Sequence, residues 1–384
     1  NVVKIVDWLL NFAVMERASD IHLEPRRGLG HVRFRVDGDL RTVYRLDYDM
    51  LVMVISRFKI LGDMKLDERR RPQDGGIKRT LENGMRLQMR LSTLPVGHGE
   101  KMVVRIFDKN VTGNDLSFIG FSPKDRDMWE WMINRPQGMI LVTGPTGSGK
   151  TTTLYTSLNK VATSEVNVCT AEDPIEMEVD NFNQVQVNPA VGMGFAECVR
   201  SFLRQDPDII MVGEIRDQET GDMALQSSLT GHLVFSTLHT NGALATIQRL
   251  VDLGLQTFLI NSSLIGILSQ RLVRKLCPHC KQLVPTDAAR WGAMLEGDDD
   301  MPMPQMVYEA RGCEECKGTG YYGRLCVYEL VKYDERIRNI VHQKVEINEL
   351  REKTKGMFTP LHANGAKLVE KGETTLDEIL KITY

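Results

Sequence analysis

The chain has 384 residues, of which 42% are hydrophobic and 26% are charged, and its formal net charge is −3. This length allows two or three domains with buried cores, and the composition is that of a globular protein rather than a disordered or fibrous one. The near balance of 48 basic and 51 acidic residues argues against a broadly basic nucleic-acid-binding surface. No apolar stretch approaches the ~18 residues that span a bilayer, and no signal peptide opens the chain. Because the chain begins at Asn1 without a methionine, we expect a fragment or a processed form.

Residues 1–110 are predicted to form a small α+β domain. Apolar residues at helical spacing indicate an amphipathic helix over 4–16. Alternating apolar residues follow in 31–44, and Asp37-Gly38 interrupts them, which predicts a hairpin.

A second hairpin is predicted to turn at Asn83-Gly84, followed by strands over 85–91 and 101–107. In both strands apolar residues alternate with polar ones. Because the side-chain period of a strand is two, Arg90 and Arg105 are expected on the faces opposite the core.

Turn-forming residues over 111–122 predict a linker, and the pattern changes after it. Continuous apolar runs now alternate with helical segments, which is typical of a parallel sheet covered by helices on both sides. We therefore predict a parallel-sheet α/β domain over 123–270. Its buried strands are expected at 139–144, 166–173, 208–214 and 232–237.

The first of these strands leads into GPTGSGKT at 144–151, which fits the phosphate-binding pattern GxxxxGK[ST]. A helix-capable run, 152–161, follows, so the strand–loop–helix context fits as well. Glycines let backbone N–H groups turn towards phosphate oxygens, and the helix N-terminus favours negative charge. Lys150 is expected to neutralise the β and γ phosphates of ATP, and Thr151 to bind Mg²⁺. The predicted nucleotide-binding residues are Gly144, Pro145, Thr146, Gly147, Ser148, Gly149, Lys150, Thr151 and Thr152.

Hydrolysis also needs a group that orients the attacking water, and two strand ends supply acids. Glu214 ends the run DIIMVGE and is our first candidate for organising Mg²⁺-bound and attacking water. Glu172 opens the acidic segment 172–176 after another apolar strand. Parallel strands end at a common edge, where ligands of such sheets bind.

Two histidines flank the strand in GHLVFSTLHTN. A lone histidine is more often structural than catalytic. We give His232 the better odds of sensing the γ phosphate, and His239 is expected to bond backbone at the next helix cap.

Seven cysteines are present, and four of them form two CxxC pairs. With 32 residues between the pairs, Cys277, Cys280, Cys313 and Cys316 predict a structural zinc site in a protruding subdomain over 271–327. Buried free cysteines or a redox pair are the alternatives. The other three are expected in a core or strand: Cys169, Cys198 and Cys326. A loop tip is predicted at 298–300, and a C-terminal helical segment over 328–384.

Five motifs in order resemble the type II secretion and type IV pilus assembly ATPases, the GspE/PilB family. They are ASDIHLEP (18–25), GPTGSGKT (144–151), AEDPIE (171–176), RQDPDIIMVGEIRD (204–217) and TGHLVFSTLHTN (230–241). Details such as NSSLIGILSQRLVRKLCPHC (261–280) resemble the type II secretion branch more closely. The resemblance implies a RecA-like ATPase domain, a small PAS-like N-terminal domain, and a homo-hexamer.

The resemblance also implies functional roles. Glu172 would act beside Glu214, and Arg90 and Arg105 of the small domain would reach the γ phosphate in a closed state. By motif position, three further arginines would act across a subunit boundary: Arg200, Arg204 and Arg216.

For the whole chain, the resemblance implies a cytoplasmic, peripheral inner-membrane ATPase that uses ATP, Mg²⁺ and Zn²⁺. It would power pseudopilus assembly in type II secretion. Its partners would be inner-membrane platform and cytoplasmic-domain proteins, without direct contact to nucleic acid. A type IV pilus extension motor, a nucleic-acid-dependent translocase and a nucleotide-binding regulator stay open as alternatives.

Overall fold

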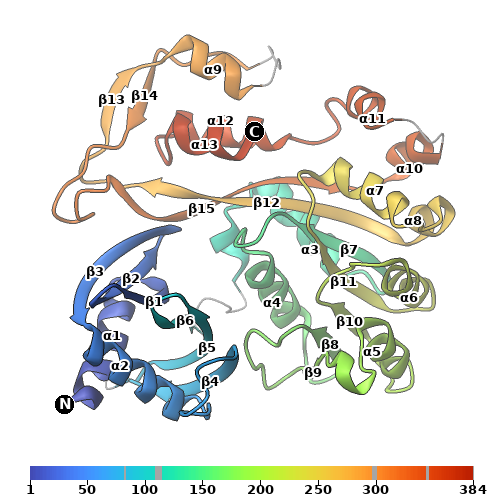
Figure 1. Ribbon diagram of the computed structural model, residues 1–384. Coiled ribbons are helices and arrows are strands. Elements are labelled where there is room, and N and C mark those ends of the chain that lie inside the picture. The colour runs from blue at the N-terminus through green and yellow to red at the C-terminus, as the bar shows by residue number, and fades with distance from the viewer. Residues whose placement is uncertain (82–83, 109–114, 296–300, 343–345, 384) are drawn as a thin grey trace. The chain divides into compact units, whose positions relative to one another are not determined.

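The computed structural model describes residues 1–81, 84–108, 115–295, 301–342 and 346–383. The chain forms two compact units, Asn1–Val111 and Thr112–Tyr384, which are described separately (Figure 1). Three sequence predictions fall outside the described residues: the turn at Asn83, the start of the linker, and the loop tip at 298–300.

The first unit is a six-stranded antiparallel sheet with two helices, in the strand order β3-β2-β1-β6-β5-β4. Both helices share one hydrophobic core with the sheet. The elements are α1 (Val2–Met15), β1 (Ala18–Arg26), β2 (Leu29–Val36), β3 (Asp39–Asp47), α2 (Tyr48–Leu61), β4 (Gln73–Thr80), β5 (Arg86–Val96) and β6 (Gly99–Asp108).

Period-two patterning decides which face of this sheet is buried, as the sequence predicts. Leu87, Met89 and Leu91 of β5 are at most 2% exposed. Arg90 pairs in register with Arg105 of β6, and both lie on the other face. The predicted helix at the start of the chain and the hairpin between β2 and β3 are also confirmed.

The second unit contains a seven-stranded sheet in the order β15-β12-β7-β11-β10-β8-β9. Its neighbours pair in parallel except for β15, which runs antiparallel to β12. The four predicted strands are confirmed as β7, β8, β10 and β11. The strands are β7 (Gly138–Thr143), β8 (Val168–Glu172), β9 (Asn183–Gln186), β10 (Ile209–Val212), β11 (Leu233–Leu238), β12 (Leu264–Leu276) and β15 (Tyr321–Lys332).

Helices cover both faces of this sheet, which explains why its central strands are continuously apolar. Every residue of β7 and β11 is buried. One face packs against η2, α3 and α4, and the other against α5 to α8, α10 and α11. The elements are η2 (Leu116–Ile119), α3 (Pro123–Ile133), α4 (Lys150–Val161), η3 (Pro189–Val191), α5 (Phe195–Phe202), α6 (Gln218–Leu229), α7 (Ala243–Asp252), α8 (Thr257–Ser263), α10 (Glu335–His342) and α11 (Ile347–Lys353).

A third core lies where the segment between β12 and β15 meets the C-terminal helices. Buried Trp291, Met294 and Val307 pack there with Ala366, Val369 and Ile379. In Figure 1 this segment appears as an orange ribbon and helix beyond the ends of β12 and β15. Its elements are β13 (Gln282–Pro285), α9 (Ala288–Met294), β14 (Met306–Glu309), α12 (Leu361–Glu370) and α13 (Leu376–Thr383).

Two predicted domain boundaries cut through strands. The boundary at 270/271 falls inside β12, and the boundary at 327/328 falls inside β15. These strands pair with each other and extend the main sheet, so the four-cysteine segment is an insertion into the second unit. The described end of the predicted linker contains η2, whose Leu116 and Ile119 are buried in the same unit.

Within the described ranges, no helix has both the length and the apolar character needed to cross a membrane.

Candidate nucleotide-binding site and four-cysteine cluster

The phosphate loop joins β7 to α4, and its backbone has the shape that the glycines allow. Gly144, Gly147 and Gly149 have φ angles of 145°, 78° and 90°, in the region that L side chains avoid. A Cβ atom on Gly144 would lie 2.4 Å from the carbonyl oxygen of Gln270. Helix α4 begins at Lys150 after Gly149, which has no side chain to cap it. The amides of the loop and first turn are therefore suited to bind an anion, so the site fits the phosphates of a nucleotide.

The side chain of Lys150 folds back over this loop. Its Nζ donates hydrogen bonds to the carbonyl oxygens of Gly144 at 2.9 Å and Pro145 at 3.0 Å. The pKa of Lys150 is lowered to about 8, mainly by burial; Glu214 opposes this shift, and Arg271 adds to it. A bound phosphate would stabilise the charged ammonium, so phosphate binding and protonation of Lys150 favour each other.

Two candidate groups lie at the carboxyl ends of adjacent strands. Glu214 follows β10 and His239 follows β11, and the two strands pair in parallel. His239 Nε2 lies 3.9 Å from one oxygen of Glu214, and Arg216 donates to the other at 2.5 Å. Burial lowers the pKa of His239, and Lys150 and Arg216 lower it further, while Glu214 opposes the shift. Lys150, Glu214 and His239 therefore interact electrostatically with one another and form one group. Thr151 follows Lys150 at the start of α4.

The structure does not bring His232 to this group. His232 precedes β11, and its carbonyl oxygen accepts a hydrogen bond from Gly138 at the start of β7. The phosphate loop begins only after Thr143, at the far end of the same pair of strands. His232 Nδ1 instead lies 2.9 Å from the carbonyl oxygen of Ser227. The expectations for the two histidines are therefore reversed: within this chain it is His239 that lies beside the candidate catalytic carboxylate.

Glu172 occupies a different environment from Glu214, although their strands are neighbours. It is the last residue of β8 and only 4% exposed. Its carboxylate accepts hydrogen bonds from the hydroxyl of Thr170 at 2.6 Å, the amide of Gln184 at 3.0 Å, and the phenol of Tyr155. Burial and the nearby carboxylate raise the pKa of Tyr155 far above its ordinary value, which keeps the phenol a donor. Glu172 is thus fixed by neutral donors on α4, β8 and β9.

A residue that sequence reasoning missed holds the phosphate loop from β12. Gln270 is 1% exposed. Its Nε2 donates to the carbonyl oxygen of Ser148 at 2.6 Å, and its Oε1 accepts from the hydroxyl of Thr153 at 2.9 Å. One amide side chain therefore links the loop to the first turn of α4. The available signal was a glutamine and an arginine, Arg271, in the middle of an otherwise apolar run.

The candidate arginines have partners within their own units. In the first unit, Arg105 Nε donates to Asp20 at 3.0 Å. In the second unit, Arg200 forms ion pairs with Glu197 and Glu219, and Arg204 donates to the carbonyl oxygen of Arg200.

The four predicted zinc ligands converge. The sulfur atoms of Cys277, Cys280, Cys313 and Cys316 all lie within 4.8 Å of one another. Three of the pairs are 3.7 to 3.9 Å apart. A tetrahedral zinc with bonds of about 2.3 Å requires sulfur atoms about 3.8 Å apart, so the cluster fits this metal.

Backbone amides already stabilise negative charge in the cluster. The amides of Cys313 and Gly320 each donate to the sulfur of Cys316 at 3.1 Å. Burial opposes ionisation, yet these bonds lower the pKa of Cys316 to about 6, whereas burial raises the pKa of Cys277 to about 12. Bound zinc would hold the ends of the segment together as a structural element. The other predicted cysteines are confirmed as core or strand residues: Cys169, Cys198 and Cys326.

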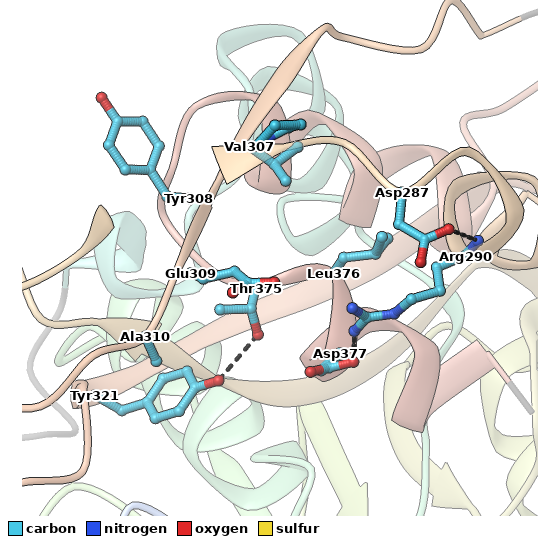
Figure 2. A pocket seen from close by; sticks show the side chains of 11 residues that line it. Asp287, Arg290, Val307, Tyr308, Glu309, Ala310, Tyr321, Thr375, Leu376 and Asp377 are labelled. Carbon is cyan, nitrogen blue, oxygen red and sulfur yellow. Dashed lines mark hydrogen bonds and ion pairs between the residues drawn. The ribbon is translucent and has the colours of Figure 1, made fainter. Parts of the chain in front are cut away.

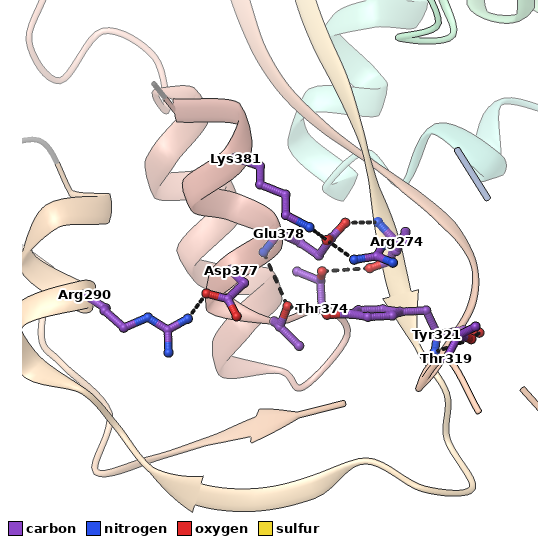
Figure 3. Close-up of polar contacts among 9 residues, drawn as sticks. Arg274, Arg290, Thr319, Tyr321, Thr374, Asp377, Glu378 and Lys381 are labelled. Carbon is purple, nitrogen blue, oxygen red and sulfur yellow. Dashed lines mark hydrogen bonds and ion pairs between the residues drawn. The ribbon is translucent and has the colours of Figure 1, made fainter. Parts of the chain in front are cut away.

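Helix α13 is tied to the same region by polar contacts. Glu378 accepts hydrogen bonds from the backbone amide of Arg274, from its guanidinium at 2.7 Å, and from Lys381 (Figure 3). Arg274 also stacks 4.0 Å over the ring of Tyr321. A pocket of about 200 Å³ opens between the β13–β14 ribbon and the start of α13 (Figure 2). Its lining includes Tyr308, Tyr321 and Thr375 and contains no residue of the phosphate loop.

The fold and site together define a P-loop protein with a RecA-like α/β core: a strand–loop–helix phosphate site beside acidic strand ends, on a parallel sheet covered on both faces. The comparison with known families agrees with this class. The sequence model described as Type II/IV secretion system protein matches residues 1–381, and the chain belongs to this family.

Curated relatives match over the full length of the chain. "Type IV pilus assembly ATPase TfpB" of Acinetobacter baylyi is 50% identical over 383 residues, which are 100% of this chain and 65% of that protein. "Type II secretion system protein E" of Pseudomonas aeruginosa is 43% identical over 382 residues, which are 100% of this chain and 75% of that protein. The chain thus spans about two thirds to three quarters of the length of these relatives.

Solved structures share the fold. The pilus retraction motor PilT with bound ADP is 25% identical, with a TM-score of 0.64 over 98% of this chain and 96% of that chain. The ATPase DotB of Legionella pneumophila is 23% identical, with a TM-score of 0.72 over 98% of this chain and 95% of that chain.

Proposed function

We propose that this chain is the ATP-hydrolysing motor of a type II secretion system. The observation that carries the proposal is the convergence at one sheet edge of the phosphate loop, Lys150, Glu214 and His239. Similar proteins that carry the name type II secretion system ATPase or protein E, at 41–43% identity across the chain, support the choice of system.

In this proposal the residues of the second unit divide the work of phosphoryl transfer. The loop amides and Lys150 bind the β and γ phosphates of ATP. The hydroxyl of Thr151 would hold Mg²⁺, which would neutralise charge on the phosphate oxygens. Glu214 orients the attacking water, and His239 lies beside it, with Nε2 3.9 Å from a carboxylate oxygen. Glu172 fixes α4 against the neighbouring strands through Tyr155, and so holds in place the helix that follows the phosphate loop.

We further propose that Arg90 and Arg105 of the first unit approach the γ phosphate in a closed state. The support is their shared position on the polar face of β5 and β6. Arg200, Arg204 and Arg216 would act at a boundary between subunits of a homo-hexamer. Hydrolysis would then move the units of each chain and drive a membrane platform from the cytoplasmic side of the inner membrane. The zinc-binding insertion would face that platform.

The ATPase proposal is tested by measuring steady-state phosphate release from wild type and Lys150→Ala. Loss of the lysine should lower turnover by at least about a hundredfold, because charge on the transferred phosphoryl group is no longer neutralised. Lys160→Ala is the matched control. Lys160 lies on the same helix, outside the phosphate loop, and its ammonium group pairs with the half-buried Glu130. Equal rates for wild type and Lys150→Ala would end the proposal.

A second candidate is a type IV pilus assembly motor, and the 50% identity to TfpB favours it specifically. The two candidates differ in the platform protein that they engage. Pull-down of the tagged chain with the platform proteins of each system separates them, and complementation of secretion or piliation in deletion strains gives the matching readout. We expect no stimulation of turnover by DNA, because the chain has a net charge of −3.

A further inference from the structure

One buried carboxylate in the second unit caps two helices at once. Glu329 lies on β15 and is 9% exposed. One of its oxygens accepts a hydrogen bond from the amide of Ala243, and the other accepts from the amide of Leu361 at 3.3 Å. These amides belong to the first residues of α7 and α12.

Neither helix has a cap of its own. The residues that precede them, Gly242 and Pro360, make no side-chain hydrogen bond to the first turn. A helix N-terminus leaves amides unsatisfied and carries partial positive charge, so a carboxylate is the group that suits it best. Glu329 supplies this carboxylate to both helices from a strand far away in the sequence.

Burial keeps the pKa of Glu329 above its ordinary value, and the nearby donors offset this effect only in part. Burial raises its pKa, whereas the two amides, Arg271 and His362 act in the opposite direction. Arg271 is itself 7% exposed and donates to the side chain of Asn241 at 3.3 Å. Arg271 also lowers the pKa of Lys150, which shows that this guanidinium lies within electrostatic reach of the phosphate site.

The short segment 239–242 connects this network to the candidate catalytic group. At its start, His239 faces Glu214 at 3.9 Å. Further on, Asn241 binds Arg271, and a Cβ atom on Gly242 would lie 3.2 Å from Glu329. The segment that presents His239 is therefore held in place at its far end by Glu329 and Arg271.

On the other side, Glu329 holds the helix that packs against the four-cysteine insertion. Ala366 and Val369 of α12 are fully buried in the core that also contains Trp291 and Val307 of the insertion. Helix α12 thus packs against the insertion through its middle and end, and its start is joined to segment 239–242 by one carboxylate.

We propose that Glu329 is a positioning residue that couples segment 239–242 at the nucleotide site to helix α12, so that binding of nucleotide changes the order of the first turn of α12. The expected change in kcat rests on the proposed ATPase function. The coupling between the nucleotide site and α12 concerns nucleotide binding alone.

The kinetic test compares Glu329→Gln with Glu378→Gln. Both replace a buried carboxylate of the same unit by its neutral isostere, but Glu378 caps neither α7 nor α12. Glu329→Gln should lower kcat about tenfold and change KM for ATP less than about threefold, because His239 and Glu214 lose their alignment while the phosphate loop stays intact. Glu378→Gln should keep the kcat of wild type. Unchanged kcat in Glu329→Gln, or equal losses in both variants, would overturn the proposal.

The binding test uses hydrogen exchange with the non-hydrolysable analogue AMP-PNP and Mg²⁺. In wild type the analogue should slow exchange at the first turns of both α7 and α12. In Glu329→Gln the effect should persist at α7 and disappear at α12. If AMP-PNP binds wild type without changing hydrogen exchange at α12, the proposed coupling is contradicted. If wild type binds AMP-PNP but hydrolyses no ATP, the proposed function fails while this experiment still decides the role of Glu329.

Discussion

The phosphate loop and the four-cysteine cluster both lie next to β12, yet they are built in opposite ways. The loop is a continuous stretch of backbone, and side chains from three other strands complete its surroundings: Gln270, Glu214 and His239. The cluster is complete in itself, with four sulfurs at the spacing that a tetrahedral ion requires. Helix α4 and the sheet hold the phosphate loop in position, whereas a bound metal would hold the four cysteines together.

Because the two sites are built differently, we expect substitutions at them to have different effects. At the nucleotide site a single change should alter rates or affinity and leave the fold intact. At the cluster a single change should alter folding of the insertion and leave the phosphate loop intact. Each of the following predictions would either break this separation or make it sharper.

The largest effect is expected for Cys316→Ser. Removal of one thiolate should abolish zinc binding, which contributes on the order of 10 kcal/mol in structural sites, and should increase hydrogen exchange in β13, α9 and β14. Metal analysis of the purified protein gives the zinc content. Cys326→Ser is the control, since Cys326 lies on β15 outside the cluster and should keep the metal. A variant Cys316→Ser that retains a full equivalent of zinc contradicts the assignment.

Glu214→Gln comes next. Loss of the carboxylate should lower kcat for ATP about 10²- to 10³-fold, or about 3–4 kcal/mol, because the attacking water loses the group that orients it. KM and thermal stability should stay close to wild type, as measured by phosphate release and calorimetry. Glu130→Gln, an exposed change on α3, serves as the control. Retention of more than about a tenth of the activity would remove Glu214 from the centre of the mechanism.

A smaller effect is expected for Gln270→Leu. The substitution removes both hydrogen bonds that join the loop to α4 and leaves buried partners unsatisfied, at a cost of about 2–3 kcal/mol. KM for ATP should rise about tenfold while zinc content stays unchanged. Thr153→Val removes only one of the two bonds, so its effect should be intermediate. If both variants bind ATP as wild type does, the amide is not what shapes the loop.

The smallest effect concerns pH and Glu378. Although burial opposes it, hydrogen bonds from Arg274 and Lys381 lower the pKa of Glu378 to about 2 from its ordinary value of 4.5. Because the folded pKa is depressed, this carboxylate stabilises the fold above pH 4.5, and its contribution disappears as the pH falls towards 2.

Glu378→Gln should therefore lower the free energy of unfolding by about 1–2 kcal/mol at pH 7, with allowance for solvent screening. The difference between wild type and variant should shrink as the pH falls from 5 to 3. Urea unfolding at several pH values measures it. A difference that is constant across this range would assign the effect to packing rather than to charge.

Much of this architecture could be predicted from the sequence, because the signals are local. Continuous apolar runs mark β7, β8, β10 and β11, and the loop motif and the CxxC pairs are each defined by short spacing. The features that the sequence did not reveal depend on register and topology. His232 is the histidine that the sequence favours, but which end of β11 lies beside the phosphate loop follows only from the pairing of that strand with β7.

The same reason explains the missed positioning residues. Gln270 binds the phosphate loop and α4, and Glu329 acts on two helix starts that lie far from it in the sequence. A polar residue inside an apolar strand is a signal, but its partners come from the tertiary fold. The boundaries predicted at 270 and 327 fall inside β12 and β15, because they follow the cysteine motifs of the insertion and not the strands that carry it.

The way in which the insertion leaves and re-enters the sheet has an evolutionary consequence. The amide of Cys277 donates to the carbonyl oxygen of Gly320 at 2.9 Å, and Leu276 pairs with Tyr321, so the two ends of the insertion are fastened side by side. A segment whose ends are clamped in this way can be lengthened, shortened or exchanged between homologues without disturbing the ATPase scaffold. The insertion could therefore change in length or sequence while β12 and β15 stay paired at its base.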